Sequence, residues 1–180
     1  MFNYFCPEFL GPVIILLNIN HIKMKKIFFI VAIIATAFVQ SSFAQDSAGM
    51  QSQLLHSYYD IKNALVAGNA NTASASAEQF LKTANGIDYK VISEGNINIL
   101  QKEATAISES KDLKEQRMHF ANLSTNMFAL AKAVKLTTQP VYYAYCPMKK
   151  TYWLSNEAII KNPYFGNAMP TCGKVVETLK

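Results

Sequence analysis

Apolar residues recur at helical spacing in four segments between Met50 and Leu136, and short turn signals separate these segments. A period of this kind is typical of helices that bury one face. Gly68 and the Asn85-Gly86 pair stand where the first two helices are expected to end. The four predicted helices span residues 50–67, 71–84, 93–109 and 112–136. Because short connections make consecutive helices antiparallel neighbours, the pattern predicts a mainly α fold, an antiparallel four-helix up-and-down bundle.

The same period assigns the buried faces of the helices. In the first helix the predicted apolar stripe consists of Leu54, Tyr58, Ile61 and Leu65. In the fourth helix it consists of Leu113, Phe120, Leu123, Met127, Leu130 and Val134. Asp112 followed by Glu115 resembles a capping box, which supports the start of the fourth helix.

Residues 24–44 have the three parts of a secretory signal peptide. Two lysines precede an apolar run, and small residues then predict cleavage between Ala44 and Gln45. The signal predicts a periplasmic protein, and no cysteine follows the run, so a lipoprotein is not expected. Residues 1–23 fit badly in front of such a signal. We interpret them as an over-extended start, with a membrane anchor as the alternative.

The expected organisation is one domain behind these leader segments. It consists of an over-extended start (1–23), a signal peptide (24–44), the helical bundle (45–136) and a C-terminal tail of the same domain (137–180). After the predicted cleavage, 14 basic residues stand against 11 acidic ones. This excess is too weak for a nucleic-acid surface, which needs basic residues clustered on one face.

Common enzyme motifs are missing from the sequence. It has no CxxC redox pair, no nucleophile elbow, no zinc-protease helix motif and no Gly-rich phosphate loop. No small-molecule substrate is evident from the residues. We therefore expect a protein that is not an enzyme.

The tail differs in composition from the helices. Residues 142–173 contain two cysteines, two methionines, five tyrosines and the only tryptophan, with turn signals but no helical period. We expect an irregular tail, rich in Cys, Met and aromatic residues, that packs on the bundle. Residues 141–145 read as extended, and residues 174–179 as a short strand or helix. Within residues 153–160 we expect a helical turn capped by Ser155.

The sulfur-containing side chains of the tail form a candidate metal site. Cys146 and Met148 are two residues apart, so in an extended chain both sulfurs point to one face. Met169 and Cys172 are three apart, a spacing that brings two side chains together across a turn. Two thiolates and two thioethers are soft donors, which select Cu(I) over harder cations.

His119 is an optional nitrogen ligand for the same site. On the fourth predicted helix it lies about 70° from the centre of the apolar stripe, at the edge of the core. The alternative is a boundary histidine without a ligand role. Trp153 could cover the ion, because Trp is the best cation–π partner.

A disulfide is the main alternative to a metal site. Export to an oxidising compartment makes a bond between Cys146 and Cys172 the default expectation for two cysteines. It would close a loop of about 26 residues and contribute on the order of 3 kcal/mol. Met148 and Met169 would then be core filler. The two alternatives exclude each other, because a metal needs the thiolates that a disulfide consumes.

The tail resembles the C-terminal signature of a domain family of unknown function from bacterial envelopes. The resemblance rests on Tyr145-Cys146-Pro147-Met148, Trp153-Leu154-Ser155, Asn162-Pro163-Tyr164-Phe165-Gly166, Met169 and Cys172-Gly173, and in the helices on Tyr58, Ala64-Leu65, Gln116-Arg117, Phe120 and Ser124. Members of this family occur alone after a signal peptide or appended to periplasmic adaptor subunits of heavy-metal efflux systems.

The resemblance implies handling of copper or a related soft metal, with an efflux adaptor or another envelope protein as partner. The Cys-Pro-Met core is also similar to short heavy-metal-binding segments in which a histidine follows the methionine. Lys149 stands in that place here, which removes one expected ligand. The function expected from these observations is a periplasmic Cu(I)-binding protein. The alternative is a disulfide-stabilised envelope interaction module without metal.

Overall fold

The computed structural model describes residues 42–180. The predicted over-extended start lies outside these residues. So does the predicted signal peptide, apart from its last three positions. The predicted cleavage position between Ala44 and Gln45 falls inside the first described helix.

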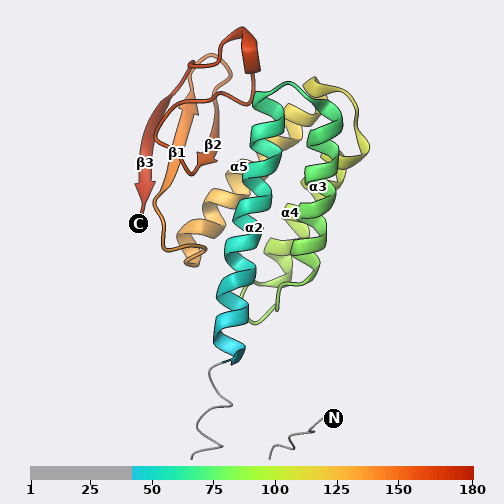
Figure 1. Ribbon diagram of the computed structural model, residues 1–180, viewed down its shortest axis with the longest axis vertical. Helices are drawn as coiled ribbons and strands as arrows, with labels where there is room; N and C mark the ends of the chain where they lie inside the picture. The colour runs from blue at the N-terminus through green and yellow to red at the C-terminus, as the bar shows by residue number, and fades with distance from the viewer. Residues whose placement is uncertain (1–41) are drawn as a thin grey trace, which may run out of the picture. The chain divides into compact units, whose positions relative to one another are not determined.

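Four helices make up most of the described chain, which confirms the prediction of a mainly α protein. They are α2 (Ser42–Val66), α3 (Ala70–Asn85), α4 (Glu94–Glu109) and α5 (Leu113–Ala133). Each helix packs against the next one in sequence (Figure 1). The first begins at Ser42 instead of Met50. None of the helices in residues 42–180 has the length and apolar character needed to cross a membrane.

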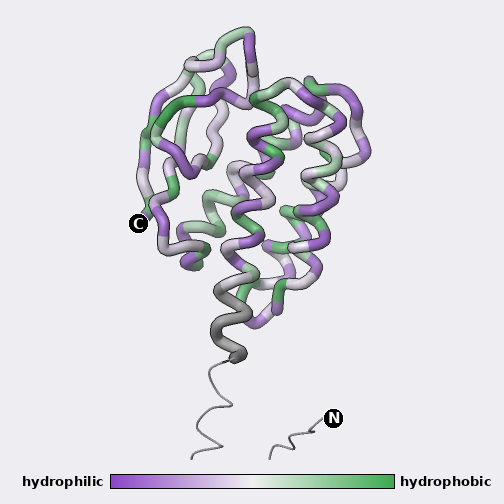
Figure 2. The backbone as a smooth tube through the Cα atoms, in the orientation of Figure 1, coloured by the Kyte–Doolittle hydropathy of each residue, from purple (hydrophilic) through white to green (hydrophobic). Residues whose placement is uncertain are grey.

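The predicted apolar stripes form the core between the helices. The four stripe residues of α2 are fully buried, and so are Phe120, Leu123 and Met127 of α5. Hydrophilic and hydrophobic positions alternate along each helix (Figure 2), as expected for helices that bury one side. The helical period therefore identified most core-facing residues correctly. Leu113 and Val134 of the last stripe are only partly buried, and α5 ends at Ala133, before the predicted end.

Gln116 is a fully buried polar side chain at the start of α5. Its Nε2 donates to the carbonyl oxygens of Ala70 (2.9 Å), Ser110 (2.8 Å) and Ile107 (3.2 Å). These carbonyls belong to the first turn of α3, the last turn of α4 and the residue that follows α4. Gln116 thereby ties three helices together at one end.

The tail contains a small antiparallel sheet, so the prediction of an irregular tail is wrong in part. Its strands are β1 (Val141–Cys146), β2 (Thr151–Ser155) and β3 (Lys174–Leu179), in the order β2-β1-β3. The extended segment predicted at residues 141–145 is confirmed, and residues 174–179 form a strand, one of the two predicted alternatives. The predicted helical turn within residues 153–160 is wrong. Trp153 pairs with Ala144 and Leu154 with Tyr143 of β1, and this cross-strand pairing outweighs local preference. Ser155 ends the strand, and its Oγ accepts the Glu157 N–H (3.1 Å).

The sheet lies beside α5, on the side away from α3 and α4 (Figure 1). The rings of Phe128 on α5 and Tyr143 on β1 are stacked, with centroids 3.5 Å apart. Tyr58 of α2 makes the second connection. Its hydroxyl bonds Ser124 Oγ (2.7 Å) and accepts the N–H of Leu154 on edge strand β2 (3.0 Å). The sheet is thus held by stacking on one helix and by a buried hydroxyl from another.

Candidate metal centre

The two cysteines of the described chain lie next to each other. Cys146 is the last residue of β1 and is fully buried, whereas Cys172 lies in the turn before β3 and is partly exposed. Because β1 and β3 pair antiparallel, with Tyr145 opposite Lys174, the end of one strand meets the start of the other. The two Sγ atoms are 3.8 Å apart and not bonded. Both sulfurs are therefore available to one ligand.

Asn162 connects the two cysteine segments, and its amide is completely buried. Its Nδ2 donates to Cys146 Sγ (3.2 Å) and to the carbonyl oxygen of Cys172 (2.5 Å). Its Oδ1 accepts the backbone N–H groups of Tyr164 (2.8 Å) and Phe165 (3.3 Å). Sequence analysis named Asn162 only within the Asn162-Pro163-Tyr164-Phe165-Gly166 motif of the resemblance. The hydrogen bond to sulfur has no signal in the sequence.

Met148 lies on the four-residue turn between β1 and β2, not in an extended segment as predicted. Strand β1 ends at Cys146, and the Lys150 N–H bonds the Cys146 carbonyl (2.8 Å). Lys150 has a φ of 56°, which reverses the chain. The Met148 side chain is 65 % exposed. The backbone of Met148 lies close enough to the Cys172 thiol to lower its pKa, so the turn lies near the cysteine pair.

Met169 lies on the other side of the pair, in the segment before Cys172. The Cys172 N–H bonds the Met169 carbonyl (3.3 Å), so the turn predicted from their spacing is present. The Met169 side chain is 39 % exposed. Both thioethers are therefore exposed on turns that contact Cys172, and neither is packed as core filler.

His119 faces a different part of the molecule. Its Nδ1 bonds Glu103 Oε2 on α4 at 2.8 Å. Arg117 on the same helix reaches the tail, with Nε 2.8 Å from the Pro163 carbonyl. Two residues along a helix correspond to a rotation of about 200°. His119 therefore points away from the side of α5 that meets the tail, and the structure does not bring it to the sulfurs.

Trp153 packs beneath the turn that contains Cys172. The ring is buried, and a Cβ at Gly173 would lie 2.7 Å from its Cη2 atom. Gly173 has a φ of 150°, a conformation that side chains rarely adopt. Glycine at this position lets the turn lie directly on the indole.

The pKa of the Cys172 thiol is raised above its usual range. Desolvation is the largest cause, followed by the hydrogen bond with Cys146 and the charge of Cys146. The Met148 N–H acts in the opposite direction. The thiol is thus protonated at neutral pH, and a metal ion that binds here must displace a proton.

Apart from the two cysteines, few side chains that commonly bind metals are available at this site. Within residues 42–180 no group of three or more His, Cys, Asp or Glu side chains is placed to hold a metal ion. A closed structural zinc site takes four such ligands. The cysteine pair therefore lacks the ligands of a structural zinc site, and further donors have to be thioethers or come from a partner.

Arg117, the only arginine of the chain, fixes the tail against α2. Its Nη2 donates to the Leu65 carbonyl (3.1 Å), while Nε donates to Pro163. Both observed partners are backbone carbonyls. Arg117 thus positions the loop that begins at Asn162.

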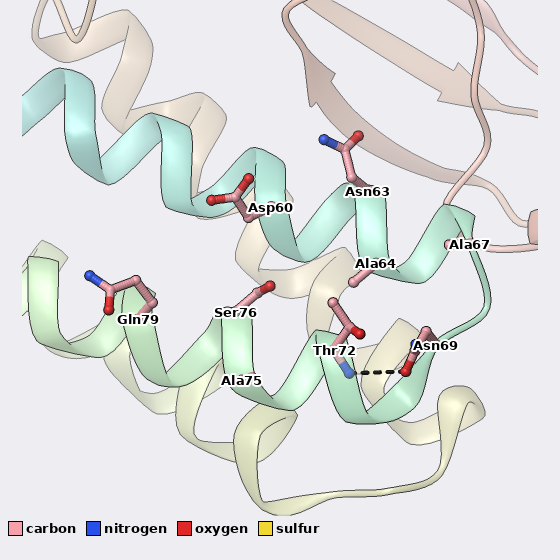
Figure 3. Close-up of a pocket in the computed structure, with 9 residues that line it drawn as sticks. All are labelled: Asp60, Asn63, Ala64, Ala67, Asn69, Thr72, Ala75, Ser76 and Gln79. Carbon is pink, nitrogen blue, oxygen red and sulfur yellow. Dashed lines mark hydrogen bonds between the residues drawn. The ribbon is translucent and has the colours of Figure 1, made fainter.

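A groove elsewhere on the surface carries no comparable chemistry (Figure 3). It has a volume of about 560 Å³ and lies between α2 and α3. Its lining consists of Asp60, Asn63, Ala64, Ala67, Asn69, Thr72, Ala75, Ser76 and Gln79. Asp60 is the single charged side chain, and the lining contains no sulfur and no imidazole. This groove offers no soft ligand.

Comparison with known families gives a match to the helical part. Residues 54–139 match the model of a family described as "Protein of unknown function (DUF3347)". The helical part is similar to an uncharacterised domain family. The match to the DUF3347 model contains Tyr58, Gln116, Arg117 and Ser124, whose side chains make the polar connections described above. It ends before β1 and therefore does not include the cysteines. No curated protein and no solved structure matches the chain.

Proposed function

We propose that this protein binds a soft metal ion, Cu(I), between Cys146 and Cys172. The observation that carries the proposal is the 3.8 Å separation of the two unbonded sulfurs. Two sulfurs that share one ion at about 2.3 Å each stand about 3.8 Å apart in a tetrahedral arrangement and about 4.6 Å apart in a linear one. The site therefore fits one ion with little movement.

In this proposal the two thiolates are the primary ligands. Met148 and Met169 supply thioether sulfur from the adjacent exposed turns, which favours Cu(I) over harder cations. His119 is left out, because it is bonded to Glu103. The four helices form an up-and-down bundle that serves as the scaffold. The protein makes no covalent change to a substrate.

The proposed place of action is the bacterial periplasm. The signal peptide at residues 24–44 exports the chain, and cleavage follows Ala44. The partner is an adaptor subunit of a heavy-metal efflux system or another envelope protein, as the resemblance of the tail motifs implies. The role is delivery or buffering of copper for efflux or homeostasis.

An anaerobic titration tests metal binding directly. Reduced protein is titrated with Cu(I) against a competing chelator, and one equivalent is expected to bind. The Cys146→Ser/Cys172→Ser double variant is expected to lose at least about a hundredfold in affinity, because both primary ligands are removed. Unchanged affinity in this variant would contradict the proposal.

The thioether role is tested with single variants. Met148→Leu and Met169→Leu are each expected to weaken Cu(I) binding by a few-fold to about tenfold. Met50→Leu is the matched control, since Met50 lies beside Gly86 at the connection between α3 and α4. A loss of affinity in the control as large as in the tail variants would contradict the assignment.

A second function follows from the same distance. Sulfurs 3.8 Å apart can also close a disulfide after a small movement, and the protein would then be an envelope interaction module without metal. Counting free thiols in protein purified from the periplasm without reductant separates the two functions. Two free thiols favour the metal site, and none favours the disulfide module.

A further inference from the structure

Asn162 makes hydrogen bonds to both cysteine segments, and these bonds are not part of an ordinary turn. An Asn at the start of a turn commonly accepts one backbone N–H, and Oδ1 of Asn162 does so with Tyr164. Its Nδ2 group makes two further hydrogen bonds outside the turn. It bridges Cys146 Sγ and the backbone of Cys172, which are far apart in sequence.

The amide of Asn162 is shielded from solvent. Asn162 has no exposed surface, so no water competes for its donors. Its own backbone is held at both ends: its N–H bonds the Pro170 carbonyl (2.9 Å), and its carbonyl accepts the Gly166 N–H (3.1 Å). Arg117 fixes the next residue, Pro163, to the helical layer. The amide is therefore anchored independently of the cysteines.

We infer that Asn162 is a positioning residue for the metal site. It holds the Cys146 sulfur and the Cys172 segment at the separation that one ion needs. Its N–H also withdraws charge from the Cys146 sulfur, as outer hydrogen-bond partners of metal ligands commonly do. This inference rests on the proposed function for the identity of the ligand. It adds a residue that the donor chemistry alone would not select.

The variant Asn162→Asp tests the positioning role most directly. It keeps an oxygen acceptor for Tyr164 and Phe165 and the shape of the side chain, but it removes both N–H donors. Asn126→Asp is the matched control, because Asn126 Nδ2 bonds only the Asn122 carbonyl on the exposed side of α5. Circular dichroism and thermal melting establish that each variant folds.

The first measurement needs no copper. Reduced protein is equilibrated with glutathione and glutathione disulfide, which takes up the two electrons and two protons released when Cys146 and Cys172 form a disulfide. Because the lost bonds let the thiols separate, Asn162→Asp is expected to form the disulfide about tenfold less favourably. The control is expected to match the wild type.

The second measurement uses the Cu(I) complex. Asn162→Asp is expected to bind Cu(I) about tenfold or more weakly. The ultraviolet charge-transfer band of its copper–thiolate complex is expected to shift, because the sulfur has lost its N–H donor. A role in folding alone would lower the melting temperature without moving the band or the glutathione equilibrium.

The outcomes separate the two proposals. If the wild type binds no Cu(I), the proposed function fails, and the glutathione equilibrium still tests Asn162. If Asn162→Asp has the wild-type equilibrium constant, the positioning role is overturned. Should this variant not fold, Asn162→Ser replaces it, because the shorter hydroxyl cannot span both bonds. Wild-type values in the serine variant would likewise overturn the inference.

Discussion

Cys172 is the point at which a metal ion or a reagent reaches the sulfur pair, since Cys146 is fully buried. The pKa of the Cys172 thiol is raised by desolvation and then by its hydrogen bond with Cys146 and the charge of Cys146. The thiolate reacts and the thiol does not, so reactivity follows this pKa. Cys146 therefore contributes, after desolvation, to how readily Cys172 is modified.

Replacing Cys146 is expected to make Cys172 more reactive at a given pH. In Cys146→Ala the hydrogen bond and the charge are gone, so the pKa of Cys172 falls and alkylation by iodoacetamide begins at lower pH. Desolvation remains, so the shift is partial. The pH profile of alkylation, followed by mass spectrometry, measures it. Thr125→Ala, an exposed change on α5, is the control, and an identical profile in both variants would contradict the assignment.

The buried ammonium of Lys62 allows a second prediction, which concerns the stability of the fold. It is 1 % exposed, its Nζ is 3.4 Å from Ser155 Oγ, and desolvation lowers its pKa. An ammonium buried without an ion pair destabilises the fold. Below the lowered pKa this cost is present in full, and it decreases as pH rises from that pKa to the ordinary lysine pKa of the unfolded state.

Lys62→Met is expected to raise the free energy of unfolding at neutral pH by on the order of 1–3 kcal/mol. The apolar chain has a similar length and needs no hydrogen bond. Urea unfolding measures the change. Lys82→Met, at an exposed position of α3, is expected to have almost no effect. A destabilised Lys62→Met protein would show that the ammonium makes a favourable contact.

The tail loop is joined to α2 through Gly166. Gly166 has a φ of 52°, and a Cβ there would lie 2.9 Å from Arg117 Nη2 and 3.0 Å from the Val66 carbonyl. A side chain would therefore strain the backbone and push the arginine from its position. This contact is how the helical layer sets the position of the loop that carries Asn162.

Gly166→Ala is expected to lower the free energy of unfolding by about 2 kcal/mol. Gly95→Ala in α4 is the matched control, because nothing lies within 4 Å of its added Cβ. Alanine is expected to stabilise that helix by roughly 0.5–1 kcal/mol. Urea unfolding of both variants compares them. Equal effects at the two positions would contradict the close approach at Gly166.

The stability of the whole molecule depends on buried tyrosines between the helices and the sheet. Burial is the main cause that raises the pKa of Tyr58 and Tyr164 well above the usual range and that of Tyr143 to about 12. An unfolded tyrosine ionises near about pH 10. Above that pH the unfolded state loses protons that the folded state keeps, so stability must fall.

The free energy of unfolding is expected to decrease steeply between about pH 10 and 12, by up to about 1.4 kcal/mol per pH unit for each such tyrosine. Urea unfolding at several pH values measures the slope. Tyr58→Phe is expected to reduce the slope. A stability that does not change over this range would contradict the burial of the three hydroxyls.

The helices were predictable because their stripes repeat with one period, and Leu54 or Phe120 can be assigned to the core from spacing alone. Two strands of the sheet were partly predictable, since residues 141–145 and 174–179 read as extended or strand-like. The strand β2 was not, because Trp153 and Leu154 extend only through pairing with β1, which local sequence does not encode. The approach of Cys146 and Cys172 depends on the pairing of β1 with β3. Their chemistry could be read from the sequence, but the bonds of Asn162 and the orientation of His119 required the fold.

X-ray absorption at the copper edge of the one-to-one Cu(I) complex tests the central claim most directly. The proposed site predicts copper that stays with the protein during anaerobic gel filtration and is coordinated by sulfur alone. Cys146→Ser/Cys172→Ser is expected to elute without copper. Coordination by nitrogen or oxygen, or copper retained by the double variant, would contradict a metal site built on the two cysteines.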